Sequence, residues 1–87
     1  MRLDRNLSTD GDGKYRLWNK RINDWDPDQD LGGENEFFLI KLKDRGSKAA
    51  LLAYAAEFVE TDPEWADDVR EMASRAGIDH PFCKEPD

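Results

Sequence analysis

Four aspartates alternate with other residues between positions 24 and 30, and this spacing is the one in the chain most suggestive of chemistry. Carboxylates at alternate positions are typical of a calcium loop. Such a loop also needs Gly at its sixth position and Glu at its twelfth, and counting from Asp24 or from Asp26 meets neither requirement. Two other interpretations stay open. The stretch is either a solvated acidic loop or an acidic patch that meets a basic partner, with Trp25 as its anchor residue.

Two further stretches partly match metal sites. Residues 8–13 read Ser-Thr-Asp-Gly-Asp-Gly, but the twelfth position counted from Ser8 is Asn19, where a bidentate Glu belongs. His80 and Cys83 have the gap of half a zinc site, and no second pair occurs in the chain. We therefore expect no metal and no cofactor, and we interpret Cys83 as a small buried or inert thiol.

The sequence lacks the residue spacings of common catalytic sites. It has one His and one Cys, no Ser/His/Asp arrangement and no phosphate-binding loop. Acidic residues are plentiful, but nothing in the sequence marks any pair of them as buried. We therefore expect a protein that is not an enzyme.

Basic and aromatic residues alternate along residues 14–22, which read Lys-Tyr-Arg-Leu-Trp-Asn-Lys-Arg-Ile. Such a strand face can stack bases and contact phosphates, although it also fits a half-buried strand whose cations extend to water. The net charge of −7, from 13 basic and 20 acidic residues, argues against a general nucleic-acid binder. The residues of this alternative nucleic-acid surface are Lys14, Tyr15, Arg16, Trp18, Lys20, Lys41 and Lys43.

The preferred hypothesis is a contact with another protein, because the acidic charge is concentrated in particular stretches. Residues 24–36 hold six acidic and no basic side chains, and the second predicted helix has an acidic face. Coulomb attraction would steer a basic partner to such surfaces. The predicted partner-binding residues are Asp24, Trp25, Asp26, Asp28, Asp30, Glu34, Glu64, Asp67 and Asp68.

These surfaces need elements to position them, and the length of 87 residues predicts one domain. We expect an extended arm and turn over 1–13, strands over 14–22 and 36–43, and the acidic loop 24–35 between the strands. The arm would add a third strand. Phe38, Ile40 and Leu42 form the face that we expect to pack on the helices. Phe37, Leu39 and Trp18 would then leave an exposed apolar sheet face, which favours a homodimer or a partner protein.

Two helices are predicted within residues 47–76. The second, over 62–76, has a capping-box pattern with Thr61 as N-cap and Glu64 three residues later. Its apolar stripe is Trp65, Val69, Met72 and Ala76, with Ala66 and Ala73 beside it. Gly77 is the expected left-handed residue after this helix, and Ile78 should fold back on its last turn.

The first helix begins after Gly46, with Ser47 as its expected N-cap. Leu51, Ala55 and Phe58 make its predicted buried stripe, which Leu52 and Val59 would extend, and its many alanines allow close approach of another element. Residues 79–87 are expected to form an irregular tail in which Phe82 packs on the helices. The whole is predicted to be an α+β domain, with a small antiparallel sheet packed against a C-terminal helical hairpin.

No stretch of the sequence has the length and apolar character of a membrane span, and residues 1–3 are not followed by the apolar core of a signal peptide. The single Cys excludes an internal disulfide framework. These features predict a protein of the reducing cytoplasm that does not enter a membrane.

Several segments resemble a group of small uncharacterised proteins of bacteriophages and prophage regions. The segments that carry the resemblance are Gly13-Lys14-Tyr15, Glu36 to Asp44, Ala53-Tyr54-Ala55, Asp62 to Ala66 and Pro81 to Lys84. The resemblance implies a phage-encoded accessory protein whose partner is a host or phage protein, and it assigns no catalytic residue. Small acidic phage proteins that block host machinery or mimic nucleic acid provide the analogy for its function.

Overall fold

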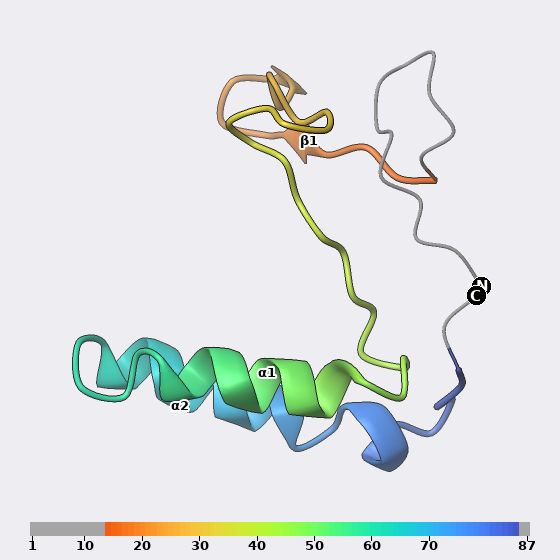
Figure 1. The fold of residues 1–87 in the computed structure, drawn as a ribbon, viewed down its shortest axis with the longest axis vertical. Helices are drawn as coiled ribbons and strands as arrows, with labels where there is room; N and C mark the ends of the chain where they lie inside the picture. The colour runs from red at the N-terminus through yellow and green to blue at the C-terminus, as the bar shows by residue number, and fades with distance from the viewer. Residues whose placement is uncertain (1–13, 86–87) are drawn as a thin grey trace. The chain divides into compact units, whose positions relative to one another are not determined.

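Among residues 14–85, the structure has two α-helices, a 3₁₀ turn and a two-stranded antiparallel sheet, so the fold is α+β, as predicted (Figure 1). The computed structural model describes residues 14–85, so the arm, turn and third strand expected over 1–13 lie outside the described residues. The sequence predicted one domain over 1–87. The contacts within the chain cluster in two units, Met1–Phe38 and Leu39–Asp87.

The sheet in the first unit is a short hairpin. Strand β1 is Trp18–Asn19 and strand β2 is Asp24–Trp25, with Trp18 opposite Trp25 and Asn19 opposite Asp24. Asn23 in the turn has a φ of 55°, a left-handed conformation that Asn tolerates better than most residues. This turn lets β1 pair with residues only a few positions further along the chain, which closes a smaller loop than pairing with 36–43 would.

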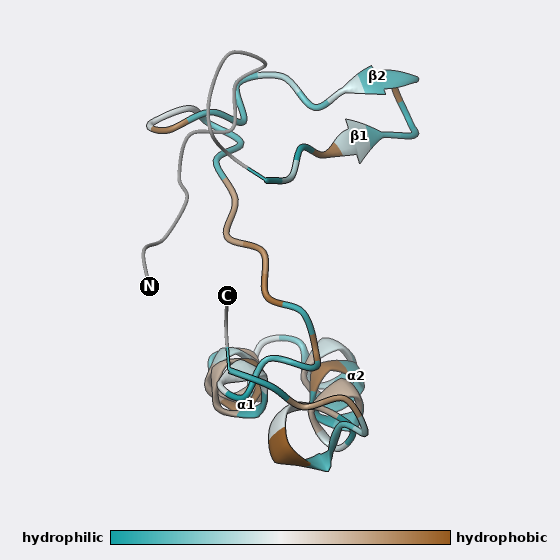
Figure 2. Ribbon diagram, turned by 90° about the vertical axis from the view of Figure 1, so that its right-hand side faces the viewer, coloured by the Kyte–Doolittle hydropathy of each residue, from teal (hydrophilic) through white to brown (hydrophobic). Residues whose placement is uncertain are grey.

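The predicted strands over 14–22 and 36–43 are therefore wrong in their extent and their pairing. Residues 20–23 form a turn, and the first two residues of the predicted acidic loop belong to β2. Residues 36–41 have no regular secondary structure, although they carry the apolar residues that appear brown in Figure 2. A period of two in hydropathy describes a strand only where another strand supplies its hydrogen bonds.

The apolar faces expected of the second strand are also not formed. Phe38 is 69% exposed and Ile40 is 37% exposed, so these two members of the predicted buried face are not in a core. Leu42 and Phe37 are half-buried. Because 36–43 is not a strand, Phe37 and Leu39 do not share a sheet face with Trp18, and the predicted homodimer loses the surface on which it rested.

The second unit contains helix α1, Ser47–Ala56, and helix α2, Pro63–Ala73, which pack against each other as an antiparallel hairpin (Figure 1). The N-cap of α2 is Asp62, whose carboxylate accepts a hydrogen bond of 3.1 Å from the backbone N–H of Trp65. Thr61 is therefore not the cap. The carboxylate one residue later caps the helix in its place and bonds the N–H of Trp65, where a Thr61 cap would have bonded that of Glu64, and Pro63 follows it in the first turn.

Ser47 is also not the N-cap of α1, because Gly46 holds that position. The hydroxyl of Ser47 is fully buried, donates to the carbonyl oxygen of Leu42 at 2.7 Å and accepts from the backbone N–H of Gly77 at 3.0 Å. The same Gly77 N–H also donates to the carbonyl oxygen of Leu42 at 2.9 Å. One serine thus joins the segment before α1 to the segment after α2.

The C-terminal end of α2 differs from the prediction. The helix ends at Ala73 with Ser74 as its C-cap, and a 3₁₀ turn, η1, follows over Gly77–Asp79. Gly77 does adopt a left-handed φ of 62°, but it begins η1 and does not directly follow α2. Ile78 is 76% exposed and does not fold back on the helix.

The core of the helical unit is built from small residues. Four alanines are at most 1% exposed: Ala55, Ala66, Ala73 and Ala76. Leu51, Phe58 and Val69 are half-buried, whereas Leu52, Val59, Trp65 and Met72 are more exposed than the predicted stripes require. The buried residues of the predicted helix 62–76 are Ala66 and Ala73, predicted beside the stripe, and Ala76, predicted within it, so the buried side of α2 is turned away from Trp65 and Met72.

The tail is held by backbone bonds at its end. Lys84 forms a parallel bridge with Asp44, and Arg45 N–H donates to the Lys84 carbonyl oxygen at 2.9 Å. The exposed Arg45 side chain pairs with Glu85 at 2.8 Å, and this hydrogen bond and charge raise the pKa of the Arg45 guanidinium. Phe82 is 74% exposed and is not packed as predicted. Cys83 is exposed, which contradicts the buried alternative of its prediction and does not test whether the thiol is inert.

Candidate protein-interaction site

The predicted anchor Trp25 is positioned by the hairpin. Its ring meets that of Trp18 edge-on, with 5.3 Å between the ring centroids, because the two residues are directly opposite in the antiparallel pair. The guanidinium of Arg16 lies over the Trp25 ring at 4.2 Å from its centroid, a cation–π contact. Trp25 remains 40% exposed. The side chain is thus held in one place and still offers apolar surface to a partner.

Gln29 shapes the loop that follows β2. It is the one buried residue among the described residues of this unit, 14–38. Its side-chain oxygen accepts from the Leu17 N–H at 2.7 Å, and its side-chain NH₂ donates to the carbonyl oxygens of Leu17 at 3.1 Å and Asp26 at 2.7 Å. The amide group therefore acts on Leu17 as a neighbouring strand would, and satisfies both of its backbone groups.

A second turn closes the loop against itself. Asn35 donates from its side chain to the Pro27 carbonyl oxygen at 2.8 Å and from its backbone to the Asp28 carbonyl oxygen at 3.0 Å. Gly33 lies so close to this turn that a Cβ atom there would be 2.1 Å from the Asp28 carbonyl oxygen. Gly33 is therefore required by close backbone approach.

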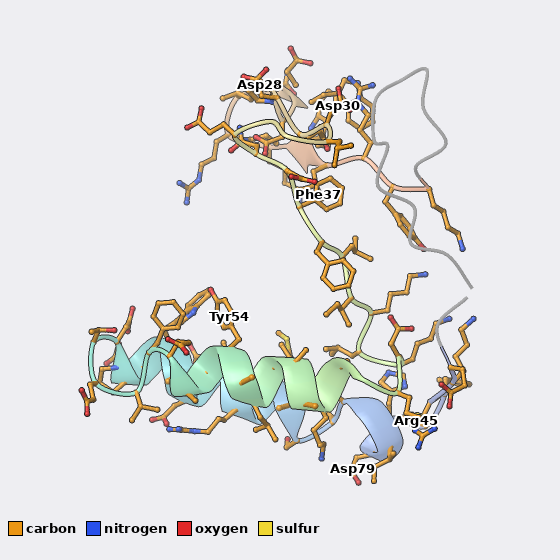
Figure 3. All side chains as sticks on the ribbon, viewed as in Figure 1. Asp28, Asp30, Phe37, Arg45, Tyr54 and Asp79 are labelled. Atoms are coloured by element: carbon orange, nitrogen blue, oxygen red, sulfur yellow. The ribbon has the colours of Figure 1, made fainter. Side chains whose placement is uncertain are left out.

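An open hollow of about 270 Å³ lies in this loop, lined by Arg16 and the residues from Asp24 to Asp30. Asp28 and Asp30, labelled in Figure 3, are exposed. Asp26 accepts a hydrogen bond from Asn19 at 3.0 Å, and Asp24 accepts one from the Trp25 N–H at 2.7 Å. No ion pair within residues 14–85 involves Asp28, Asp30 or Glu34. Their carboxylates are therefore not neutralised by any of the described residues.

The structure brings together five of the predicted partner-binding residues, Asp24, Trp25, Asp26, Asp28 and Asp30, and Glu34 is exposed further along the same loop. Glu64, Asp67 and Asp68 lie on α2 in the other unit, where Asp67 pairs with Arg70. Sequence reasoning missed Gln29, which sets the loop conformation. No residue pattern marks it, because the groups that it bonds belong to the backbone.

The alternative basic surface is assembled only in part. Arg16 and Trp18 meet at Trp25, and Lys14 lies 5.7 Å from the centroid of the Tyr15 ring. Lys20 is in the turn after β1. Lys41 and Lys43 were expected on the strand paired with 14–22, and that pairing does not exist. The face of the Trp25 ring that Arg16 covers is not open to a stacking base.

The metal-like patterns do not form a binding cluster in the part of the chain that the structure describes. No group of three or more His, Cys, Asp or Glu side chains among residues 14–85 is arranged to hold a metal ion. The Nδ1 atom of His80 accepts from the Phe82 N–H at 3.0 Å, which occupies one of its two ring nitrogens. The loop beginning at Ser8 lies mostly outside the described residues.

Comparisons of the chain with protein-family models, with curated proteins and with solved structures found no match. Among residues 14–85, neither helix has the length and apolar content that crossing a membrane requires.

Proposed function

We propose that the protein is a small acidic, phage-encoded accessory protein of the cytoplasm that acts by binding a host or phage protein. The contact is the acidic loop around Trp25, and the partner presents a basic surface. The observation that carries this proposal is the combination of a fixed, half-exposed Trp25 with carboxylates at positions 28, 30 and 34 that have no ion pair within residues 14–85. No cofactor enters the proposal.

An exposed tryptophan bordered by charged side chains resembles the aromatic centre and polar rim of protein interfaces. Tryptophan contributes large contact area at low entropic cost and is enriched among residues that dominate binding energy. Exposed carboxylates accelerate the encounter with a basic partner and discourage acidic competitors. Because alternating aspartates also present negative charge at short intervals, the loop has the character of a nucleic-acid mimic.

Single-stranded nucleic-acid binding through the basic residues is the alternative. The Arg16–Trp25 contact is the one observation that favours it, since guanidinium and indole groups both stack on bases. The four aspartates around that contact oppose a polyanion by like charge. We therefore place it second.

The test is capture of partners from host lysate by the tagged full chain, with and without nuclease, read by mass spectrometry. Two variants with the same change in net charge serve as each other's control. The loop variant carries Asp28→Asn, Asp30→Asn and Glu34→Gln, and the helix variant carries Glu57→Gln, Glu64→Gln and Asp68→Asn. Within residues 14–85 the side chains of Asp28, Asp30 and Glu34 form no hydrogen bond or ion pair, so the loop variant should fold.

We expect a protein that survives nuclease, is retained by the helix variant and is lost from the loop variant. A protein lost only from the helix variant would bind the predicted residues Glu64 and Asp68 on α2 and would not test the loop. Equal capture by the loop variant would show that the loop is not the contact. Loss of the captured material after nuclease treatment would instead favour the nucleic-acid alternative, which an anisotropy titration with single-stranded DNA at low salt then measures directly.

A further inference from the structure

The helical unit leaves several of its largest apolar side chains partly exposed. Tyr54, labelled in Figure 3, lies with its ring centroid 5.1 Å from that of Phe58 and 6.5 Å from that of Trp65. Val69 and Met72 follow Trp65 by four and seven residues, which places them on the same side of α2. We call these five residues, Tyr54, Phe58, Trp65, Val69 and Met72, the aromatic face.

The aromatic face is incompletely covered. Tyr54 is 47% exposed, Trp65 is 48% exposed and Met72 is 39% exposed, while the alanines at 55, 66, 73 and 76 are at most 1% exposed. Large side chains that do not fill a core, and that gather on one side of a helical hairpin, mark an interaction surface more often than an accident of packing. Tyrosine, tryptophan and methionine are also the residue types enriched in interface cores.

Carboxylates line the edges of this face. Glu57 follows Tyr54 by three residues and Asp68 follows Trp65 by three, so each lies one turn from an exposed ring. Glu64 precedes Asp68 by four residues on the same edge of α2. The cations of this unit that could neutralise them are engaged elsewhere: Arg70 pairs with Asp67, Arg75 with Glu71 and Lys48 with Asp79. Within residues 14–85, Glu57, Glu64 and Asp68 have no ion pair.

We propose that the aromatic face docks a cationic amphipathic helix of a partner protein. Apolar residues spaced i, i+3, i+4 and i+7 on the incoming helix would cover Tyr54, Trp65 and Met72, and its flanking lysines or arginines would meet the three edge carboxylates. This inference stands independently of the acidic loop, because it concerns a different unit with its own apolar anchors.

The negative charge at the edges of the aromatic face favours a cationic helix over a second copy of the chain, an anionic lipid surface or a nucleic acid. A second copy of the chain would bring Glu57, Glu64 and Asp68 against the same carboxylates, and this like-charge contact opposes a symmetric dimer. An anionic lipid surface or a nucleic acid would meet the same repulsion. A cationic helix supplies both the apolar surface and the missing countercharge.

The probe for the test is a synthetic 15-residue peptide in which leucines occupy positions i, i+3, i+4 and i+7 and lysines fill the polar face. Two control peptides accompany it: one of the same composition with the leucines spread around the helix, and one with glutamate in place of lysine. The isotope-labelled full chain is titrated by NMR, which reports the Trp65 indole and Met72 methyl signals separately from those of Trp18 and Trp25.

We expect saturable shifts at Trp65, Tyr54 and Met72 with the amphipathic lysine peptide only. Met72→Gln, which keeps length and helix propensity, should weaken binding about tenfold, as expected for one central contact. The helix variant defined above should also weaken binding about tenfold at low salt and reduce its salt dependence. The loop variant, with an equal change in net charge, should bind as the unchanged chain does.

Several results would overturn the proposal. Equal binding of the control peptide whose leucines are spread around the helix would show that binding depends only on its positive charge. Shifts at Trp25 in place of Trp65, or weakening by the loop variant, would move cationic binding to the acidic loop and leave the proposed function intact. Absence of saturable shifts up to about millimolar peptide, or a concentration-dependent dimer whose contacts cover Met72, would reject a partner helix as the occupant.

Discussion

The two units of the chain reach an ordered backbone by opposite means. In the first unit the one buried residue among 14–38 is Gln29, a polar side chain that bonds three backbone groups. In the second, the buried residues among 39–85 are Ser47, four alanines and Gly77, and the two helices pack against each other. Hydrogen bonds from the Gln29 side chain hold the loop in place, whereas packing between small side chains holds the helices together. In both units the large apolar side chains remain partly exposed.

This difference determines which substitutions each unit tolerates. A site held by hydrogen bonds depends on the chemical identity of the donor and acceptor, and a substitute of similar size does not replace them. A contact between small residues depends on volume, and any larger side chain forces the helices apart. The same difference explains why each unit keeps aromatic surface available for binding.

The largest effect is expected from Ala66→Leu, which adds bulk at a fully buried position of α2. Overpacking of this contact should lower the free energy of unfolding of the helical unit by about 3 kcal/mol. Thermal unfolding followed by helical circular dichroism measures it, with the exposed Ala53→Leu on α1 as the matched control. If Ala66→Leu and Ala53→Leu unfold at the same temperature, close packing of small residues does not hold the helices.

Gly33→Ala should have the next largest effect, in the first unit. The new Cβ would lie 2.1 Å from the Asp28 carbonyl oxygen, so the turn must open at a cost of about 2 kcal/mol. Hydrogen exchange at the Leu17 N–H should become faster while helical circular dichroism is unchanged. Gly46→Ala is the control, because no atom lies within 4 Å of a Cβ atom there. Equal exchange rates in both variants would contradict the close approach.

Gln29→Met keeps the length of the side chain and removes its three hydrogen bonds. We expect a loss of about 1.5 kcal/mol, because the Leu17 N–H loses its acceptor, while the Leu17 carbonyl oxygen keeps the Asp26 N–H as a donor. Gln29→Glu sharpens the comparison, since the carboxylate keeps the acceptor and loses both N–H donors. Its protonated form regains one donor, so the stability of this variant should rise as the pH falls. Exchange at Leu17 that is insensitive to both substitutions would show that Gln29 does not order the loop.

Ser47→Ala is expected to have the smallest effect of the four, although its hydroxyl is fully buried. The Gly77 N–H keeps its second acceptor, the Leu42 carbonyl oxygen, so the loss should be about 1 kcal/mol. Ser74→Ala, which removes an exposed hydroxyl bonded to the Glu71 carbonyl oxygen, is the control and should change stability less. A larger loss than that of Gln29→Met would show that hydrogen bonds matter as much in the helical unit as in the loop.

The candidate site was predicted more fully than the elements that carry it. Asp24, Trp25, Asp26, Asp28 and Asp30 were grouped by their spacing alone, and they do line one hollow. The secondary structure around them was predicted incorrectly, because Trp25 lies in strand β2, opposite Trp18, and not in a loop. Short-range spacing places neighbours together whether the local structure is a loop or a strand.

The sequence by itself determined the two helices, their order and the α+β class, since capping residues, helical periodicity and alanine content act within a few residues of one another. Only the tertiary structure decided which stretch pairs with β1, which face of α2 is buried and what Ser47 and Gln29 bond. The bonds of Ser47 and Gln29 join groups distant in the sequence, 30 residues apart for Ser47 and Gly77 and 12 for Gln29 and Leu17, whereas β1 pairs with a nearby stretch in preference to the distant one that was predicted. A hydropathy pattern cannot specify such partners, because backbone donors and acceptors are present at nearly every residue.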